Sequence, residues 1–346
     1  MSILSGVSEF FGLDIGTSLI RVVQLSGSGP VKALNKYGSV EIAGNIAVSD
    51  AKPDQLKLAD AIRRLVKDAG INTKNVAVGI PSNRVFTTVV DMERLSPAEL
   101  AKTIKYQADS IIPTPLAESK IDWAPLGDSP KGSSKVEVLL SSVNNAYIES
   151  RLDVLEGAGF NVIAFEPDTF ALVRSLIATD VVAPQMVLDI GTVSTDLVIA
   201  MKGAPRLTRS ISVGSDTILK AAVHGLNIDP AQAAQFLYKF GLSKAKLEGQ
   251  VYNSIITTID NLTSEIEKSI KFFQTRYPNI VIDRIIVTGG ASTLPEFPLH
   301  IANKFGINVE IGNSWRNITF PASKQDELLS MSNHFAVAAG LAERNT

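Results

Sequence analysis

The sequence contains no cysteine, few histidines and no excess of either charge. Without cysteine there are no disulfide bonds and no thiolate metal sites, a composition that fits a reducing compartment. His224, His300 and His334 are not clustered, which argues against a histidine-ligated metal. Lysine and arginine number 33 against 35 aspartate and glutamate residues, so the basic excess of a nucleic-acid-binding domain is missing. We therefore expect no nucleic-acid partner.

Long apolar runs are missing as well. No run approaches the roughly 18 residues that cross a bilayer, and Met1–Phe10 lacks the basic start and the apolar core of a signal peptide. We expect a soluble, cytosolic protein with no direct membrane insertion. Its 346 residues, 45% of them hydrophobic, are enough for two or more domains with sizeable cores.

The motif Asp-Ile-Gly-Thr occurs twice, beginning at Asp14 and at Asp189, each time between two short apolar runs. This pattern predicts a strand, a tight polar turn and a second strand. Glycine lets backbone N–H groups approach an anion, and threonine and serine hydroxyls add donors. An aspartate at the end of the strand can hold the hydrated Mg²⁺ that accompanies a polyphosphate.

An ordinary hairpin with turn-forming residues would explain one copy of the motif. Two copies are harder to explain in that way, and they lie too far apart for a solenoid, whose repeat spans roughly 20–50 residues. We interpret them as two half-sites, one in each of two related domains, that close on one polyphosphate.

Apolar periodicity predicts an α/β layer fold in the first half of the chain. Residues 10–48 predict three strands, a helix follows over 53–69, and a buried strand over 76–81. Residues 82–158 then predict strand, helix, strand, strand and helix, which we interpret as a small subdomain inserted into the first half.

The second half continues with alternating strands and helices, and two of its features leave alternatives open. The helix over 251–276 carries an apolar stripe that fits a core helix or a coiled coil. Gly289-Gly290 leaves room for a flat ligand or a close backbone, or forms a plain strand-to-helix turn. Besides these, we expect helices over 170–178, 230–240 and 334–342, the second hairpin over 187–201, and strands over 207–213 and 285–288.

The two Asp-Ile-Gly-Thr turns, followed by Thr288–Ala291, resemble the actin, heat-shock chaperone and sugar kinase superfamily. The resemblance implies an α/β, actin-like (ribonuclease H-like) two-lobed ATPase fold, in which both hairpins clamp the phosphates of ATP and the Gly-Gly turn borders the adenosine. It assigns to the nucleotide Asp14, Gly16, Thr17, Ser18, Asp189, Gly191, Thr192, Thr195, Gly214, Glu265, Lys268, Gly289, Gly290 and Ala291, with Asp14 and Asp189 holding Mg²⁺ through water.

Phe165-Glu166-Pro167 lies between the halves and is similar to the Glu-Pro start of the first interdomain helix in bacterial actins. In those proteins the glutamate orients the attacking water, so the resemblance makes Glu166 the candidate catalytic residue. A glutamate before a proline at a helix start is also an ordinary capping choice.

The place of the insert narrows the resemblance, because the cell-division protein FtsA carries its relocated subdomain there. Residues 107–116 with 121–123, 12–18 and 265–273 are similar to stretches of the PilM family, the actin-like cytoplasmic components of type IV pilus assembly. FtsA ends in an amphipathic membrane helix, whereas this sequence stops just after its last core helix, so we expect the PilM family.

The resemblance also implies a division of the chain into four subdomains. The first actin-like subdomain is expected over 9–81, 160–184 and 335–346, and the FtsA-type insert over 82–159. The second actin-like subdomain is expected over 185–226 and 281–334, and the helical nucleotide-capping subdomain over 227–280.

The resemblance implies an ATP-binding adaptor with at most slow ATPase activity. It would bind the short cytoplasmic tail of the inner-membrane protein PilN in a groove beside the insert, and link the alignment complex to the motor. Contacts with the pilus assembly ATPases would fit the same role, peripheral at the inner face of the inner membrane. The alternatives are an FtsA-like filament-forming protein and a small-molecule kinase of the superfamily. A kinase needs a substrate base near the γ-phosphate, and no acidic residue is clearly placed for that role, with Asp168 and Asp196 left open.

Overall fold

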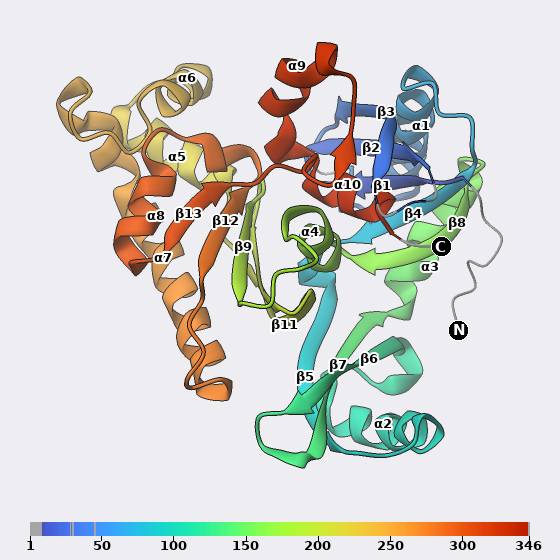
Figure 1. Ribbon diagram of the computed structural model, residues 1–346. Helices are drawn as coiled ribbons and strands as arrows, with labels where there is room; N and C mark the ends of the chain where they lie inside the picture. Colours follow the sequence, from blue (N-terminus) through green and yellow to red (C-terminus); the bar gives the residue numbers. More distant parts are fainter. Residues whose placement is uncertain (1–8, 28, 30, 45, 345–346) are drawn as a thin grey trace.

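Two mixed β-sheets carry the fold of this computed structural model, which describes residues 9–344 except 28, 30 and 45 (Figure 1). The first sheet has the order β14-β3-β2-β1-β4-β8. Strands β1 and β2 form an antiparallel hairpin that pairs Asp14 with Arg21, and β4 and β8 extend the sheet in parallel. The strands are β1 (Phe11–Ile15), β2 (Leu19–Ser26), β3 (Lys32–Glu41), β4 (Asn75–Ile80), β8 (Asn161–Pro167) and β14 (Ile318–Thr319).

The second sheet repeats this arrangement in the order β11-β10-β9-β12-β13. Here β9 and β10 form the antiparallel hairpin, and β12 pairs with β9 in parallel. The same local sequence thus yields the same hairpin in both lobes, as the two motifs predict. The strands are β9 (Gln185–Ile190), β10 (Thr195–Met201), β11 (Ala204–Ile211), β12 (Arg284–Thr288) and β13 (Asn308–Ile311).

Helices cover one face of the second sheet and extend beyond it. The longest, α7 (Gln250–Arg276), buries Ile255, Ile259 and Ile266 in the same core as the apolar side chains of β9 and β12. The core-helix interpretation of its apolar stripe is therefore correct and the coiled-coil alternative is not. The other helices of this lobe are α5 (Ser215–Leu226), α6 (Pro230–Phe240) and α8 (Phe297–Phe305).

The inserted subdomain is a three-stranded sheet, in the order β5-β7-β6, with one helix on a face of it. A capping box starts the helix, because Ser96 and Glu99 exchange side-chain and backbone hydrogen bonds. Its elements are β5 (Val85–Glu93), α2 (Pro97–Ile111), β6 (Ser119–Ser129) and β7 (Gly132–Asn144).

Helix α3 (Asn145–Gly157) follows the insert and packs on the first lobe. It buries Val154 and Leu155 in the core that contains Leu58 and Ile62 of α1 (Lys52–Asp68). The expected boundary at residue 159 places this helix in the insert, whereas its packing belongs to the first lobe. Helical periodicity does not show against which sheet a helix packs.

Two helices cross between the sheets, α4 (Asp168–Leu176) and α10 (Ala336–Ala342). They approach so closely that a Cβ atom on Gly340 would lie 2.0 Å from the carbonyl oxygen of Ala171. Helix α4 begins at Asp168, two residues before the predicted start, with Pro167 at its N-cap. This earlier start places Asp168 in the first turn of the helix. A short helix, α9 (Gln325–Ser330), precedes α10.

Buried ion pairs fasten the insert to the second lobe. Arg276, at the end of α7, contacts Asp91 of β5 at 2.6 Å and Glu137 of β7 at 2.9 Å. Arg206 of β11 lies 3.3 Å from the other oxygen of Glu137, and the hydroxyl of Tyr277 donates a 2.6 Å hydrogen bond to this carboxylate. Glu137 is 2% exposed. The insert therefore bridges the two lobes, although its chain leaves and re-enters the first.

Candidate functional site

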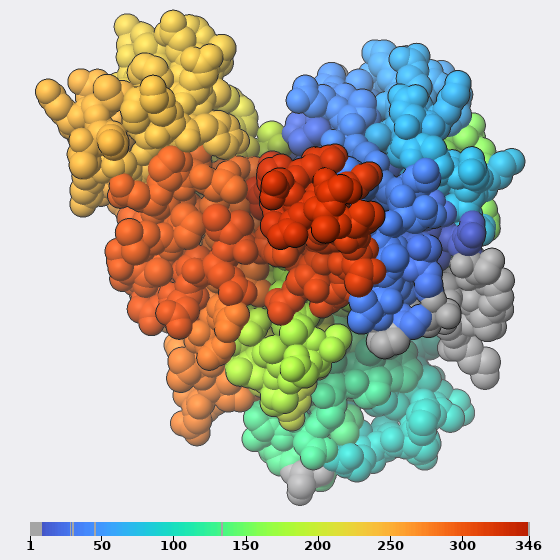
Figure 2. Space-filling view, turned by 45° about the horizontal axis from the view of Figure 1, so that its top comes forward, coloured from blue at the N-terminus to red at the C-terminus, as the bar shows by residue number. Residues whose placement is uncertain are grey.

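A cavity of about 400 Å³ lies between the lobes, where the two Asp-Ile-Gly-Thr turns face each other. In Figure 2 the surface is hollowed between the gold helices of the second lobe and the blue first lobe. The tips of the turns touch, since the Ser18 and Thr192 hydroxyls are 2.7 Å apart. We call this space the interlobe cavity. Its lining includes nine predicted nucleotide residues, namely Asp14, Gly16, Thr17, Ser18, Asp189, Gly191, Thr192, Gly289 and Gly290.

The two turns are built alike. The Gly16 amide donates to the Leu19 carbonyl at 3.0 Å, and the Gly191 amide donates to the Ser194 carbonyl at 2.9 Å. A Cβ atom on Gly16 would lie 2.8 Å from the Leu19 oxygen, so a larger residue would open the turn. Both turns direct polar groups into the cavity from opposite sides, as expected for two half-sites.

Four carboxyl groups gather at the floor of the interlobe cavity: Asp14, Asp168, Asp189 and Asp196. Burial, with the nearby charges of Asp196 and Asp14, raises the pKa of Asp189 to about 7. Burial also raises the pKa of Asp14, although Arg21 opposes the rise from 3.0 Å. The pKa of Asp168 is raised well above its usual range, by burial and then by the neighbouring carboxylates. The cluster has more negative charge than Arg21 can balance.

This donor set fits a hydrated divalent cation. Asp168 and Asp196 each have a buried Oδ1 atom with no hydrogen-bond partner. Oxygen ligands of this kind suit Mg²⁺, which keeps several of its waters. Within the described part of the chain, no three acidic or histidine side chains converge closely enough to ligate a metal directly. Asp14 and Asp189, the residues predicted to hold the ion, line the same cavity.

A smaller apolar pocket of about 140 Å³ adjoins the interlobe cavity and shares Thr192, Ser215 and Tyr238 with it. The backbone of Gly289 has a φ of +83°, and a Cβ atom there would lie 2.4 Å from the Asp189 carboxylate. Only glycine fits this position, which holds the Gly-Gly turn against the second hairpin. The apolar residues that line the smaller pocket are Ile218, Leu219, Ala234, Leu237, Ala291 and Leu294.

Four predicted nucleotide residues do not line either space. Thr195 is buried and donates a 2.7 Å hydrogen bond to the Val213 carbonyl. Gly214 packs under the second turn, where a Cβ atom would lie 2.5 Å from the Thr192 oxygen. On α7, Glu265 and Lys268 form an ion pair at 2.6 Å outside the cavity lining. Thr195 and Gly214 thus pack behind the turn of the second hairpin.

Glu166 faces away from the interlobe cavity. It is 3% exposed, and its Oε1 accepts a 2.5 Å hydrogen bond from Arg174 while its Oε2 accepts one from Arg344. Both carboxylate oxygens are therefore engaged. The acidic side chain at the start of α4 that lines the interlobe cavity is Asp168, which the sequence offered only as an alternative.

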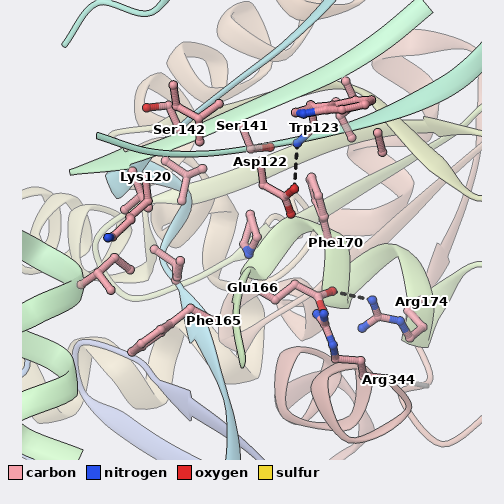
Figure 3. A pocket seen from close by; sticks show the side chains of 18 residues that line it. Lys120, Asp122, Trp123, Ser141, Ser142, Phe165, Glu166, Phe170, Arg174 and Arg344 are labelled. Carbon is pink, nitrogen blue, oxygen red and sulfur yellow. Dashed lines mark hydrogen bonds and ion pairs between the residues drawn. The ribbon is translucent and has the colours of Figure 1, made fainter. Parts of the chain in front are cut away.

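Glu166 lines a second cavity, of about 680 Å³, between the insert and the first lobe (Figure 3). We call it the groove. Five consecutive residues of β6, Lys120 to Ala124, line it, and among the described residues β6 is an edge strand with β7 as its one neighbour. Because consecutive residues of β6 line the groove, its edge borders the groove and its unpaired backbone groups are within reach of an occupant. The opposite wall is Phe165, Pro167, Phe170, Arg174 and Arg344.

Sequence reasoning missed several residues that line the interlobe cavity. The sequence does contain a signal for Arg21, because it is the charged residue in the apolar strand Leu19–Leu25. The hairpin register places it opposite Asp14. The others lie far from any motif and are brought in by packing alone: Asn83, Arg84, Tyr147, Arg151, Tyr238 and His334.

A family model described as type IV pilus assembly protein PilM matches residues 12–346. The chain belongs to this family. This confirms the predicted membership, which rested on short stretches of sequence. Across the described residues of this PilM-family chain, no helix is both long and apolar enough to span a membrane.

Solved structures share the fold along nearly the whole chain. A PilM-PilN type IV pilus biogenesis complex matches with a TM-score of 0.83 at 24% identity, covering 97% of this chain and 98% of the other. MreB5 of Spiroplasma citri bound to ADP matches at 0.59 and 14% identity, covering 96% and 95%. The ethanolamine utilization protein EutJ from Carboxydothermus hydrogenoformans matches at 0.58 and 14%, covering 96% and 88%. The predicted actin-like fold is confirmed.

Proposed function

We propose that this PilM-family chain is a nucleotide-binding adaptor that holds the cytoplasmic tail of PilN in the groove. In this role it would sit at the inner face of the inner membrane and link the pilus alignment complex to the motor. The observation that carries the proposal is the groove itself, which is open, lined by both apolar and charged side chains, and bordered by a strand edge. A PilM-PilN complex with the same fold supports PilN as the partner.

The groove suits an extended peptide. An unpaired strand edge can accept a further strand, and pockets on alternate sides then select its side chains. Trp123 of β6 and Phe170 of α4 both line the groove (Figure 3), and Trp123 also packs against the core of the insert. Lys120 and Asp122 add one charge of each sign at the β6 side. The expected occupant is a short segment with apolar anchors and few charges.

The interlobe cavity would hold ATP with Mg²⁺. The two turns would bind the phosphates through amides and hydroxyls, and Asp14 and Asp189 would hold the ion through water. MreB5 of Spiroplasma citri, with the same fold, has been solved with ADP and with AMPPNP, which supports an adenine nucleotide. We assign the orientation of an attacking water to Asp168, not Glu166, because both Glu166 oxygens are bound by arginines.

Nucleotide would act on the partner through closure of the lobes. If the open and closed forms hold the tail with different affinity, the nucleotide shifts tail binding by that difference and by no more. Hydrolysis is not required for this role, which is consistent with slow or absent ATPase activity.

The test is a calorimetric titration of a synthetic PilN tail peptide. We expect Trp123→Ala to weaken binding about 30-fold, the cost of removing an aromatic anchor worth about 2 kcal/mol. Tyr106→Ala is the matched control, since Tyr106 lies on α2 of the same insert, is 84% exposed and does not line the groove. Equal affinity of wild type and Trp123→Ala would show that the tail binds elsewhere.

A further inference from the structure

The interlobe cavity and the groove share a wall. The short helix η1 (Ser82–Arg84) joins β4 to β5, and Arg84 lines the interlobe cavity while the next residue, Val85, lines the groove. On α3, Tyr147 lines the interlobe cavity and Ile148 lines the groove. At the start of α4, Asp168 faces one space and Phe170 the other. A shift of these segments therefore changes both spaces at once.

Two arginines project from this wall into the interlobe cavity. The guanidinium groups of Arg84 and Arg151 lie 5.5 and 5.3 Å from the centre of the Tyr147 ring. Arg151 also donates a hydrogen bond to the Ala47 carbonyl, while Arg84 is exposed. In the described part of the chain neither arginine forms an ion pair with a carboxylate. The ring holds both cations beside the cavity and leaves their charge uncompensated.

The interlobe cavity is lined by charges of both signs. Among its aspartates, Asp14 is already paired with Arg21. Arg84 and Arg151 lie at the wall formed by η1 and α3. A polyphosphate with a hydrated cation complements this arrangement, because the carboxylates take the cation and the arginines take phosphate oxygens. Arginine suits this purpose, since its planar fork binds phosphate with two hydrogen bonds.

The turn η1 also contacts the second lobe. It packs against β11, the strand paired with β10 of the second hairpin. The turn therefore contacts the second lobe and leads, through Val85, into the insert and the lining of the groove.

We propose that Arg84 and Arg151 bind the terminal phosphate of the nucleotide and transmit its presence to the groove through the shared wall. The inference rests on the proposed function and names the residues that distinguish a nucleoside triphosphate from a diphosphate. Binding moves Arg84 together with Val85, and Arg151 together with Ile148, which lies one helical turn before it. The groove responds to the third phosphate and not to nucleotide as such.

The test compares AMPPNP, a non-hydrolysable ATP analogue, with ADP, both with Mg²⁺, by calorimetry. We expect Arg84→Ala to weaken AMPPNP binding about tenfold, the effect of losing hydrogen bonds to a charged group, and to leave ADP binding unchanged. Arg84→Lys should restore part of the loss, because it keeps the charge without the fork. Arg63→Ala is the control, since Arg63 is exposed on α1 and forms a surface ion pair with Asp60.

A second titration with the PilN tail peptide measures the coupling. Wild type is expected to bind the tail with different affinity in AMPPNP and in ADP, and Arg84→Ala to lose this difference while the nucleotide-free affinity stays the same. Equal weakening of both nucleotides, or of neither, overturns the inference and leaves the proposed function intact. Failure of wild type to bind either nucleotide overturns both.

Discussion

Glu343 shows, at the scale of single residues, how burial changes the titration of a carboxyl group in this fold. It follows α10, beside Arg344, and its Oε1 atom is buried without a hydrogen-bond partner among the described residues. Burial is the main cause that raises its pKa to about 7, against the opposing effects of Asn317, Arg174, Lys32 and Arg316. Burial likewise raises the pKa of the aspartates that line the interlobe cavity.

The raised pKa of Glu343 predicts a pH dependence. Between about pH 4.5 and 7 the folded protein keeps a proton that the unfolded chain has lost, so stability falls as pH rises through this window. Glu343→Gln mimics the protonated side chain and removes that loss. We expect the free energy of unfolding of the variant to exceed that of wild type by about 1.4 kcal/mol per unit of difference between the folded and the unfolded pKa of Glu343. This advantage is complete above pH 7.

Urea unfolding at pH 5 and pH 8 measures this difference. Glu156→Gln, an exposed position on α3, serves as the control and should differ little from wild type at either pH. A Glu343→Gln effect that is the same at both pH values would contradict the account.

At the scale of elements, the crossing of α4 and α10 positions both cavities. Glu166 at the end of β8 lines the groove and Asp168 at the start of α4 lines the interlobe cavity, so the crossing fixes how the two sites lie relative to each other. Gly12 of β1 contributes to the same packing, because a Cβ atom there would lie 2.4 Å from the Ala338 carbonyl oxygen. Small residues let the helices and the strand approach to backbone contact.

Gly340→Ala tests this crossing. The added methyl group would meet the Ala171 backbone at 2.0 Å, so we expect a loss of about 1–3 kcal/mol from overpacking. The matched control is Gly157→Ala at the end of α3, where a Cβ atom meets nothing within 4 Å. For Gly157→Ala we expect the free energy of unfolding to rise by as much as about 1 kcal/mol, because alanine has less backbone entropy to lose on folding than glycine. Urea unfolding that ranks the two variants in the opposite order would refute the close crossing.

The sequence predicts these elements where the signal is local. The two hairpins, the capped start of α2 and the stripe of α7 follow from turn residues, capping residues and helical spacing. The packing partner of α3 does not follow, because Val154 and Leu155 would suit either sheet. Asp14, Gly16, Asp189 and Gly191 of the interlobe cavity were visible in the repeated motif. Arg84, Tyr147 and Arg151 were not, since only tertiary packing brings them to the hairpins.

At the scale of the whole molecule, the insert is coupled to both lobes. It is connected by chain to the first lobe, while Asp91 and Glu137 bind Arg276 and Arg206 of the second. A rotation of the second lobe therefore pulls on the insert and on the groove that it borders. Breaking one of these buried pairs would leave an unpaired buried charge, which costs free energy. The proposed adaptor would use this connection to relate nucleotide and partner binding.

The central claim is that one nucleotide is held jointly by Asp14 of the first lobe and Asp189 of the second. Calorimetric titration of Mg-ATP tests it in wild type, Asp14→Ala and Asp189→Ala, with Asp60→Ala, an exposed position on α1, as control. Unchanged circular dichroism would establish that each variant is folded. We expect one ATP per chain for wild type and the control, and no binding when either Asp14 or Asp189 is replaced. Normal affinity in either of those two variants would contradict it.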